Sequence, residues 1–301
     1  MLNCTAYKHG QIHILLWSSS INTFKRKSND DESGNIKPFL KWAGGKFQII
    51  NQIRQSLPPG HRLIEPFVGA GSVFLNTHYE HYLLADINQD LVDCLNYLKN
   101  EKQLFIEFCR PFFQEQYNRK DAYLDLRHQF NQTPDSRLKA ALFIYLNRHC
   151  FNGLMRYNQE GLFNTSFGAY KTPYFPEQEM QAFTKKADLA QIICADYTHS
   201  MERAVVGDVV YCDPPYVPLS GTAHFTKYHA TGFGQAEQER LVLMARALAS
   251  KGIPVILSNH DTDFVQHLYA GAQITRFYVQ RSISCQGTKR EKVPELLALF
   301  D

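Results

Sequence analysis

Short apolar runs that end in turns organise the first patterned part of the chain. Leu63 to Phe67 forms one such run and leads into a turn at Val68 to Ser72. A helical stretch follows at 73–76, and a second apolar run spans His81 to Asp86. Strand, turn, helix and strand in this order are typical of the opening of a doubly wound α/β sheet.

The same alternation returns in the last third of the chain. Gly207 to Cys212 is expected to form a buried strand, and 236–250 a helix. Further strands are expected at Ile253 to Ser258 and at Phe277 to Val279. The predicted fold class is therefore α/β, with both ends of the patterned sequence contributing to one domain.

The middle of the chain has a different pattern. Helical periodicity runs from 91 to 99 and from 137 to 147. The segment 150–175 is irregular, and glycines such as Gly153 and Gly161 punctuate it. The pieces between the glycines indicate a β-hairpin with long polar loops. A helical, hairpin-bearing module is therefore expected to interrupt the α/β domain.

These patterns divide the chain into three parts. Residues 37–88 and 177–301 are expected to form the α/β domain, and 89–176 the inserted module. Residues 1–36 are expected to be a disordered extension, because residues 25–36 are highly charged and polar. The alternative explanation is a start codon that was assigned too far upstream. The apolar run Ile12 to Trp17 is too short to span a membrane.

Composition narrows the class of protein only moderately. The 301 residues are 44% hydrophobic and 20% charged, as in a soluble globular enzyme, and the formal net charge is +3. Any nucleic-acid-binding surface must therefore come from local clusters of basic residues. The seven cysteines are scattered without a CxxC pair, so neither a zinc site nor a disulfide framework is expected, and a reducing, cytoplasmic setting fits best.

The turn 67–71 is the first candidate ligand site. Gly69 and Gly71 let the backbone approach a ligand closely. Asp86 ends the next strand at the carboxyl edge of the sheet, where it can accept hydrogen bonds from ribose hydroxyls. Because the third glycine of a dinucleotide fingerprint is missing, we expect an adenosyl ligand without pyrophosphate. The alternative is a plain tight turn, with Asp86 as a helix cap.

A basic, glycine-containing segment precedes this turn. Lys41 and Lys46 flank Trp42 and a Gly-Gly pair. Lysines beside glycines are typical of anion binding, although the string lacks the GxxxxGK[ST] spacing of a phosphate-binding loop. Trp42 fits either the core or a binding site.

Asp213-Pro214-Pro215-Tyr216 is the strongest candidate for chemistry. The string follows a buried strand, so Asp213 should emerge at the same edge of the sheet as the glycine turn. Two prolines stiffen the turn, which presents the Asp213 carboxylate, the Pro214 carbonyl and the Tyr216 ring. The two acceptors can bind both N–H groups of a nucleobase amine and stabilise charge that develops on its nitrogen, while Tyr216 stacks on the base. The alternative is a strand that ends in a proline turn. A methyl donor would have to lie in line with this nitrogen, within near-attack distance. Such a transfer needs no metal, but it requires a base that is flipped out of a duplex.

A series of motifs resembles the Dam family of DNA adenine methyltransferases. FLKWAGGK, IEPFVGAGSVF, LLADIN, NGLMRYN, FGAYKTPYFPE, YCDPPY and LSNHDT occur in the order of that family, and the resemblance covers about 37–300. It implies a Rossmann-like domain that uses S-adenosylmethionine (SAM), with an inserted target-recognition domain that carries a β-hairpin. It also implies methylation of adenine in duplex DNA, at GATC.

The resemblance implies roles for individual residues. The catalytic group is expected to be Asp213, Pro214 and Tyr216. The expected SAM contacts are Trp42, Lys46, Phe67, Gly69, Gly71, Asp86 and Asp213.

The resemblance also implies how DNA is read. Arg156 is expected to read a guanine, Leu154 to touch a thymine methyl group, and Lys41 to read the first base pair. Phe151 is expected to fill space beside the flipped base. Taken by itself, Arg156 would be interpreted as a solvated surface charge. Three further residues suit phosphate or sugar contacts, namely Asn152, Asn158 and Tyr170.

Departures from the family pattern affect the edge of the recognition segment. Ser166 and Ala169 stand where the family has a proline and an arginine, which implies a weaker phosphate contact and an altered contact at the outer base pair. A C-terminal basic cluster contacts phosphate or is simply solvated; its residues are Arg281, Lys289, Arg290 and Lys292.

Two other classes of function remain open at this point. One is methylation of RNA or of a protein amide, and related enzymes that act on glutamine carry Asn-Pro-Pro-Tyr. Asp213 argues against this alternative, and so does the segment expected to recognise DNA. The other is a non-catalytic DNA-binding module, against which the intact Asp213 and Tyr216 argue. The expected partner is double-stranded DNA, with no membrane and no obligate protein partner, and one adenine per half-site is compatible with a monomer.

Overall fold

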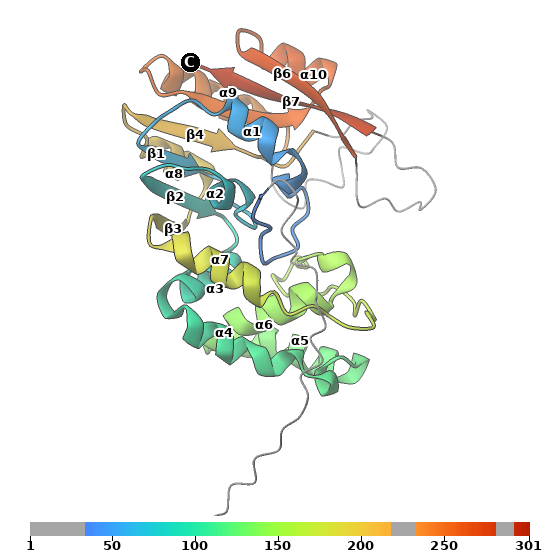
Figure 1. The fold of residues 1–301 in the computed structure, drawn as a ribbon. Coiled ribbons are helices and arrows are strands. Elements are labelled where there is room, and N and C mark those ends of the chain that lie inside the picture. Colours follow the sequence, from blue (N-terminus) through green and yellow to red (C-terminus); the bar gives the residue numbers. More distant parts are fainter. Residues whose placement is uncertain (1–33, 218–232, 281–291) are drawn as a thin grey trace, which may run out of the picture.

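The computed structural model describes residues 34–217, 233–280 and 292–301 (Figure 1). Its centre is a seven-stranded sheet in the order β3-β2-β1-β4-β5-β7-β6. The first five strands in this order run parallel, whereas β7 is antiparallel to both β5 and β6. The strands are β1 Arg62–Glu65, β2 His81–Asp86, β3 Ala190–Cys194, β4 Asp208–Cys212, β5 Val255–His260, β6 Gln273–Gln280 and β7 Lys292–Phe300.

Helices cover both faces of the sheet, and a further group of helices lies beside its β3 edge (Figure 1). The helices of the sheet region are η1 Lys46–Ile49, α1 Ile50–Ser56, α2 Ser72–Asn76, α3 Gln89–Glu101, α7 Glu177–Ala187, α8 Tyr197–Glu202, α9 Gln235–Ala249 and α10 Asp263–Leu268. Between α3 and α7 the chain forms α4 Gln103–Cys109, η2 Arg110–Phe113, η3 Glu115–Tyr117, α5 Lys120–Gln132, α6 Ser136–His149 and η4 Phe151–Gly153.

Neighbouring residues of the central strands point to opposite faces of the sheet. Leu63 and Val209 belong to the core that α1, α2 and α3 cover, whereas Ile64 and Val210 belong to the core that α8 and α9 cover. All four side chains are fully buried. A parallel sheet that is buried on both faces requires such continuous apolar runs. The expected α/β fold class is therefore confirmed.

The order of the strands reverses its direction between β1 and β4. The chain passes from β1 outwards to β2 and β3 and then returns to β4, on the other side of β1. In open α/β sheets, ligands bind at the carboxyl ends of the strands at such a reversal. Because β1 leads into the Gly69 turn and β4 leads into Asp213, both motifs lie at this reversal.

The strand boundaries differ from expectation where pairing is non-local. The strand expected at 253–258 is β5, Val255–His260. Its start is shifted because Pro254 lacks an N–H donor, and its end is extended because His260 still pairs with Glu295 of β7. Strands β3 and β7 were not predicted from the apolar pattern.

The hairpin expected in 150–175 is reduced to two isolated antiparallel bridges, Cys150 with Phe167 and Tyr157 with Phe163. Side chains of the neighbouring α5 form hydrogen bonds with backbone N–H and C=O groups between these bridges. Asn131, for example, donates to the carbonyl of Phe163 at 3.0 Å and accepts its N–H at 2.9 Å. These side-chain hydrogen bonds take the place of a regular strand ladder.

Helix α3 connects the sheet with the group of helices beside it. It packs on β2 and β3 and also on α6. Before η1, the chain runs between the sheet and these helices (Figure 1). Of the extension expected at 1–36, residues 1–33 lie outside the described part, whereas Ile36 exchanges two backbone hydrogen bonds with the Asn76 side chain at the end of α2.

Candidate functional site

The glycine turn after β1 is held against the end of β2. Gly69 and Gly71 have φ angles of +50° and +74°, which favour glycine. The N–H of Gly69 donates to Oδ2 of Asp86 at 3.1 Å, and the N–H of Asn88 donates to its Oδ1 at 3.0 Å. Burial raises the pKa of Asp86, while these backbone donors lower it. The predicted residues Gly69, Gly71 and Asp86 are thus brought together.

Two aromatic residues lie on opposite sides of this turn. The indole of Trp42 lies directly over Gly69, where a Cβ would come within 2.8 Å of its ring atoms Cδ1 and Nε1. Phe67 packs on the other face of the sheet and stacks on Tyr197, with the ring centres 5.6 Å apart. Gly69 therefore permits a close approach by Trp42, while Phe67 extends the aromatic lining to the α8 side.

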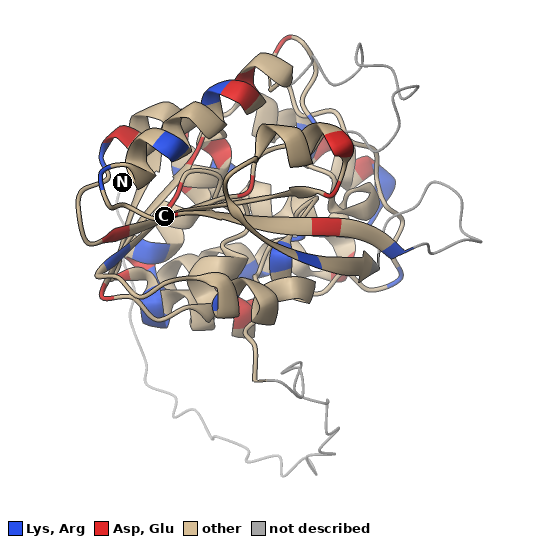
Figure 2. Ribbon diagram, turned by 90° about the horizontal axis from the view of Figure 1, so that it is seen from above, with Lys and Arg blue, Asp and Glu red and all other residues tan. Residues whose placement is uncertain are grey.

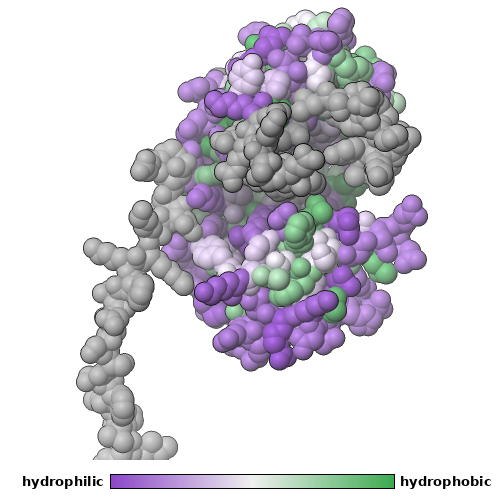
Figure 3. Space-filling view, turned by 90° about the vertical axis from the view of Figure 1, so that its right-hand side faces the viewer, coloured by the Kyte–Doolittle hydropathy of each residue, from purple (hydrophilic) through white to green (hydrophobic). Residues whose placement is uncertain are grey.

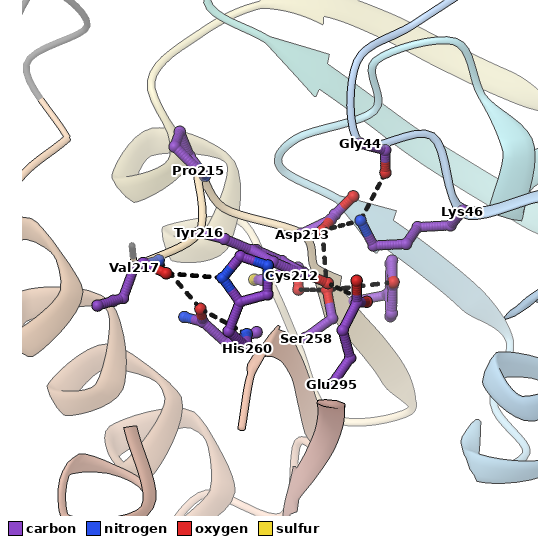
Figure 4. A network of polar contacts seen from close by, with 12 residues as sticks. Gly44, Lys46, Cys212, Asp213, Pro215, Tyr216, Val217, Ser258, His260 and Glu295 are labelled. Atoms are coloured by element: carbon purple, nitrogen blue, oxygen red, sulfur yellow. Dashed lines mark hydrogen bonds and ion pairs between the residues drawn. The ribbon is translucent and has the colours of Figure 1, made fainter. Parts of the chain in front are cut away.

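An ion pair joins the segment before η1 to the turn after β4. Nζ of Lys46 lies 2.7 Å from Oδ1 of Asp213 and donates to the carbonyl of Gly44 at 2.6 Å (Figure 4). Lys46 is only 7% exposed. A buried ammonium group needs such partners, because its transfer from water is otherwise costly. The structure thus places two predicted SAM-site residues in direct contact.

The turn after β4 retains two hydrogen-bond acceptors. Oδ1 of Asp213 receives the hydroxyl of Ser258 at 2.9 Å in addition to the ion pair with Lys46. Within residues 34–217, 233–280 and 292–301, neither Oδ2 of Asp213 nor the carbonyl of Pro214 accepts a hydrogen bond. Two open acceptors on one rigid turn match the two N–H groups of an exocyclic base amine.

Tyr216 presents its ring between Lys46 and His260. Nζ of Lys46 lies 4.5 Å from the centre of the Tyr216 ring, and the His260 ring meets it edge to face at 4.8 Å. The Tyr216 hydroxyl donates to Oε2 of Glu295 at 3.3 Å. Burial, followed by the negative charge of Asp213, raises the pKa of Tyr216 well above its usual value. Tyr216 is thus a neutral, oriented ring beside the two open acceptors.

Several residues at the site were not assigned a role from the sequence. Ser258 and His260 come from the end of β5, and Glu295 comes from β7. The sequence pattern could have indicated Ser258 and His260 as site residues. Ser258-Asn259-His260 places three polar residues directly after an apolar run, at the carboxyl edge of a buried strand. The contribution of Glu295 depends on the pairing of β7 with β5.

Lys41 is anchored between the sheet and the segment 150–175, which is predicted to read DNA. Its backbone N–H donates to Oδ1 of Asn147 at 2.8 Å, and its carbonyl accepts from Nδ2 of Asn147 at 2.7 Å. Its Nζ lies 4.4 Å from the centre of the Tyr170 ring, whose hydroxyl accepts the N–H of Asn152 at 2.8 Å. Burial and the nearby charge of Arg148 lower the pKa of Lys41. The structure thus gathers Lys41, Asn152 and Tyr170.

The other predicted DNA-reading residues lie along the following loop. Nε of Arg156 donates to Oδ1 of Asn164 at 2.8 Å, which orients its exposed guanidinium group. Oδ1 of Asn158 accepts the backbone N–H groups of Glu160 and Leu162, so any phosphate contact of Asn158 falls to its amide nitrogen.

Two large apolar side chains of this region face solvent. Phe151 is 54% exposed and Leu154 is 40% exposed. Figure 3 shows hydrophobic residues gathered on this side of the helical half of the molecule. Grouped apolar residues on a polar surface are typical of a binding surface.

Three further features concern metal binding, membrane spans and the distribution of charge. In the described part of the chain, no group of three or more His, Cys, Asp or Glu residues is arranged to hold a metal ion. No described helix is long and apolar enough to cross a membrane. Basic and acidic residues are interspersed over the described elements seen from above (Figure 2). Binding of a polyanion on that face would depend on short local clusters.

Comparison with solved structures shows only distant likeness. A putative RNA methyltransferase from Pyrococcus horikoshii aligns with a TM-score of 0.35 and 9% identity, covering 88% of this chain and 89% of that chain. A precorrin-6y C5,15-methyltransferase from Geobacter metallireducens aligns with a TM-score of 0.36 and 8% identity, covering 88% and 98%.

Comparison of sequences is far more specific. Residues 42–283 match the family model of D12 class N6 adenine-specific DNA methyltransferases. The DNA adenine methylase of Vibrio cholerae serotype O1 is 51% identical over 265 residues, which are 88% of this chain and 96% of that protein. The DNA adenine methylase of Escherichia coli K12 is 48% identical over 264 residues, covering 88% and 95%. The chain therefore belongs to the D12 class of N6 adenine-specific DNA methyltransferases, and it is a site-specific enzyme that methylates adenine in DNA.

Proposed function

We propose that the enzyme transfers a methyl group from SAM to N6 of adenine in GATC, in duplex DNA, after the target base has been flipped out. The observation that carries this proposal is the pair of open acceptors, Oδ2 of Asp213 and the carbonyl of Pro214, at the reversal of strand order beside the Gly69 turn. A base inside a duplex cannot bring its N6 to such a turn, so flipping is required.

The residues around the Gly69 turn suit an adenosyl ligand. Asp86 lies where it can accept hydrogen bonds from ribose hydroxyls, and the glycines of the turn leave room for close backbone approach. Trp42 and Phe67 offer apolar ring surfaces. When bound, SAM supplies an electrophilic methyl group. We assign its contacts to Trp42, Lys46, Phe67, Gly69, Gly71, Asp86 and Asp213.

We propose that Asp213, Pro214 and Tyr216 act directly on the target base. Oδ2 of Asp213 and the Pro214 carbonyl accept the two N–H groups of N6, draw the nitrogen towards a tetrahedral geometry and stabilise its developing positive charge. Tyr216 stacks on the base. Lys46 and Ser258 both approach Oδ1, which leaves Oδ2 directed to the substrate.

We propose that 89–176 forms the target-recognition part, and that 37–88 and 177–301 form the catalytic part. Arg156 reads a guanine with its paired N–H donors, Leu154 contacts a thymine methyl group, and Lys41 reads the first base pair. Phe151 fills space beside the flipped base. The backbone of the DNA is held by Asn152, Asn158 and Tyr170. We further propose that the enzyme works as a cytoplasmic monomer.

A plasmid from methylase-deficient cells that express this chain tests the specificity. We expect its GATC sites to resist an endonuclease that adenine methylation blocks. With purified protein, labelled methyl groups from SAM should enter a GATC duplex and should not enter a duplex with one base pair of the site exchanged. GATC sites that remain fully cuttable, with no methylated adenine elsewhere, would falsify the proposal; label in another sequence context would contradict the GATC assignment alone.

A further inference from the structure

Three residues outside the motif bind the backbone of the catalytic turn. Nε2 of Gln238, on α9, donates to the carbonyl of Pro215 at 2.7 Å. Oδ1 of Asn259, on β5, accepts the N–H of Val217 at 3.2 Å. Nδ1 of His260, the last residue of β5, lies 2.7 Å from the carbonyl of Val217 (Figure 4). Because a carbonyl oxygen only accepts, this ring nitrogen carries the hydrogen.

Gln238 and Asn259 form a buried amide pair with its donors and acceptors matched. Nδ2 of Asn259 donates to Oε1 of Gln238 at 3.2 Å and to the hydroxyl of Tyr269 at 3.1 Å. Gln238 is 2% exposed and Asn259 is fully buried. A buried polar group that is left without its partner costs about 1–3 kcal/mol, so these amides need matched partners. Their partners include the Pro215 carbonyl and the Val217 N–H, so the amide pair fixes the backbone of the turn in place.

His260 acts on both the backbone and the ring of the turn. Its Nδ1–H holds the Val217 carbonyl, and its ring meets the Tyr216 ring edge to face, with 78° between the planes. The His260 side chain thus orients Tyr216 in two ways, through its hydrogen bond to the neighbouring Val217 and through its contact with the Tyr216 ring. Rotation of the Tyr216 ring would break the edge-to-face contact.

Only some carbonyls of the turn are bound. The carbonyl of Cys212 receives the Ser258 hydroxyl at 3.3 Å, that of Pro215 receives Gln238, and that of Val217 receives His260. Among the described residues, no donor reaches the carbonyls of Asp213, Pro214 and Tyr216, and of these three we assign that of Pro214 to the target amine. We propose that Gln238, Asn259 and His260 are positioning residues that lock the catalytic turn, so that the Pro214 carbonyl stays open and correctly placed for the target amine.

This inference deepens the proposed function and rests on it. None of the three residues needs to touch substrate, because they act through Pro215, Tyr216 and Val217. Methyl transfer requires the nitrogen, the methyl group and both acceptors in one near-attack geometry, and a displacement of about 1 Å can cost about a hundredfold in rate. DNA binding, which depends on other contacts, should be little affected.

Substitutions at His260 separate its hydrogen bond from its ring. His260→Phe keeps an aromatic edge but removes the donor, whereas His260→Asn keeps an N–H donor at the position of Nδ1. The control is His267→Phe on α10, an exposed histidine whose Nδ1 likewise lies 2.6 Å from a backbone carbonyl, that of Asp263. The full chain is assayed with labelled SAM and a GATC duplex for kcat, for KM for DNA and for Tm.

We expect His260→Phe to lower kcat about tenfold to a hundredfold, with KM for DNA and Tm close to wild type, and His260→Asn to restore most of the lost rate. His267→Phe should behave as wild type. A His260→Phe enzyme with wild-type kcat overturns the inference. A variant whose KM for DNA rises while kcat stays at the wild-type value overturns it as well. An inactive wild-type chain would instead contradict the proposed function.

A second substitution tests the inference if His260→Phe does not fold. Gln238→Leu removes the donor to Pro215, and Gln235→Leu on the same helix is its control, because Gln235 is exposed and pairs only with Glu239 among the described residues. We expect Gln238→Leu to lower kcat about tenfold or more, with DNA affinity unchanged. Equal kcat for the two leucine variants would remove Gln238 from the positioning set.

Discussion

Nζ of Lys46 lies 2.7 Å from Oδ1 of Asp213, which joins two segments that are far apart in the sequence. The segment that ends at Lys46 also carries Trp42, which covers Gly69, and Lys41, whose side chain lies against Gly153 of the segment 150–175. Three residues within the stretch 41–46 thus contact the candidate cofactor turn, the turn that carries Asp213 and the proposed recognition segment. A displacement of this segment would therefore alter the contacts at all three places.

The first prediction concerns the Lys46–Asp213 pair. Lys46→Met removes a buried ammonium group and leaves the carboxylate without its charge partner, so we expect a loss of about 3–5 kcal/mol in the free energy of unfolding, together with a large fall in kcat/KM. Urea unfolding measures the first quantity. Lys102→Met breaks the exposed pair with Asp188 and should cost about 1 kcal/mol or less. Equal losses for the two variants would contradict a special role of the buried pair.

The second prediction concerns Asp213 itself. Asp213→Ala removes a proposed acceptor of the target amine, so we expect methyl transfer to fall by about a hundredfold to a thousandfold or more. DNA binding, measured by fluorescence anisotropy, should largely survive, because the recognition segment is unchanged. A variant that loses its cooperative thermal transition would instead assign Asp213 a mainly structural role.

The third prediction concerns sequence discrimination by Arg156. Its exposed guanidinium group is oriented by Asn164, and Arg156→Ala should cost about 1–3 kcal/mol of discrimination at one base pair of the site. Competition between GATC duplexes and single-exchange duplexes measures this loss. An equal weakening on every duplex, with a smaller salt dependence, would identify Arg156 as a phosphate contact.

The fourth prediction concerns the contact between Gly69 and Trp42. Gly69→Ala places a Cβ within 2.8 Å of the indole at a φ of +50°, so Trp42 must move and SAM affinity should fall. Gly252→Ala is the matched control, because its φ is +76° and nothing lies within 4 Å of the added Cβ. Both variants should lose about 1–2 kcal/mol of stability. Calorimetry should show weaker SAM binding for Gly69→Ala alone; equal SAM affinity in the two would argue against a site at this turn.

The fifth prediction concerns Glu65, which ends β1 and is 2% exposed. Burial raises its pKa from 4.5 to about 8 in the folded protein, and the nearby charge of Lys186 opposes this rise. Between these two values the folded state holds a proton that the unfolded chain releases. The contribution of the protonated Glu65 to the free energy of unfolding is therefore complete below pH 4.5 and is lost as the pH rises towards 8. The free energy of unfolding falls by at most about 1.4 kcal/mol per pH unit in this range.

Glu65→Gln tests this dependence, because glutamine cannot titrate. We expect the free energy of unfolding of the wild type to fall more steeply between pH 4.5 and 8 than that of Glu65→Gln. Glu202→Gln, at an exposed position of α8, is the matched control. Parallel curves for the wild type and Glu65→Gln would show that Glu65 is ionised in both states.

Local patterns were sufficient for the central strands but not for the edge of the sheet. The apolar runs of β1, β2 and β4 identify buried strands because both faces of a parallel sheet exclude water. The antiparallel pairing of β7 with β5 and β6 connects distant segments, and no local pattern specifies such a partner. The hairpin prediction was only partly right for a related reason, since α5 side chains bind backbone groups that would otherwise join a ladder.

The sequence by itself determined which reactive groups the catalytic turn presents. Asp213, Pro214 and Tyr216 are close in the chain and two prolines stiffen them, so local stereochemistry is enough. Only the tertiary structure decided which acceptors of that turn remain open. Lys46, Gln238 and His260 arrive from separate elements, and they meet the turn because packing across both faces of the sheet brings those elements to the carboxyl end of β4. Such contacts depend on the whole folded chain.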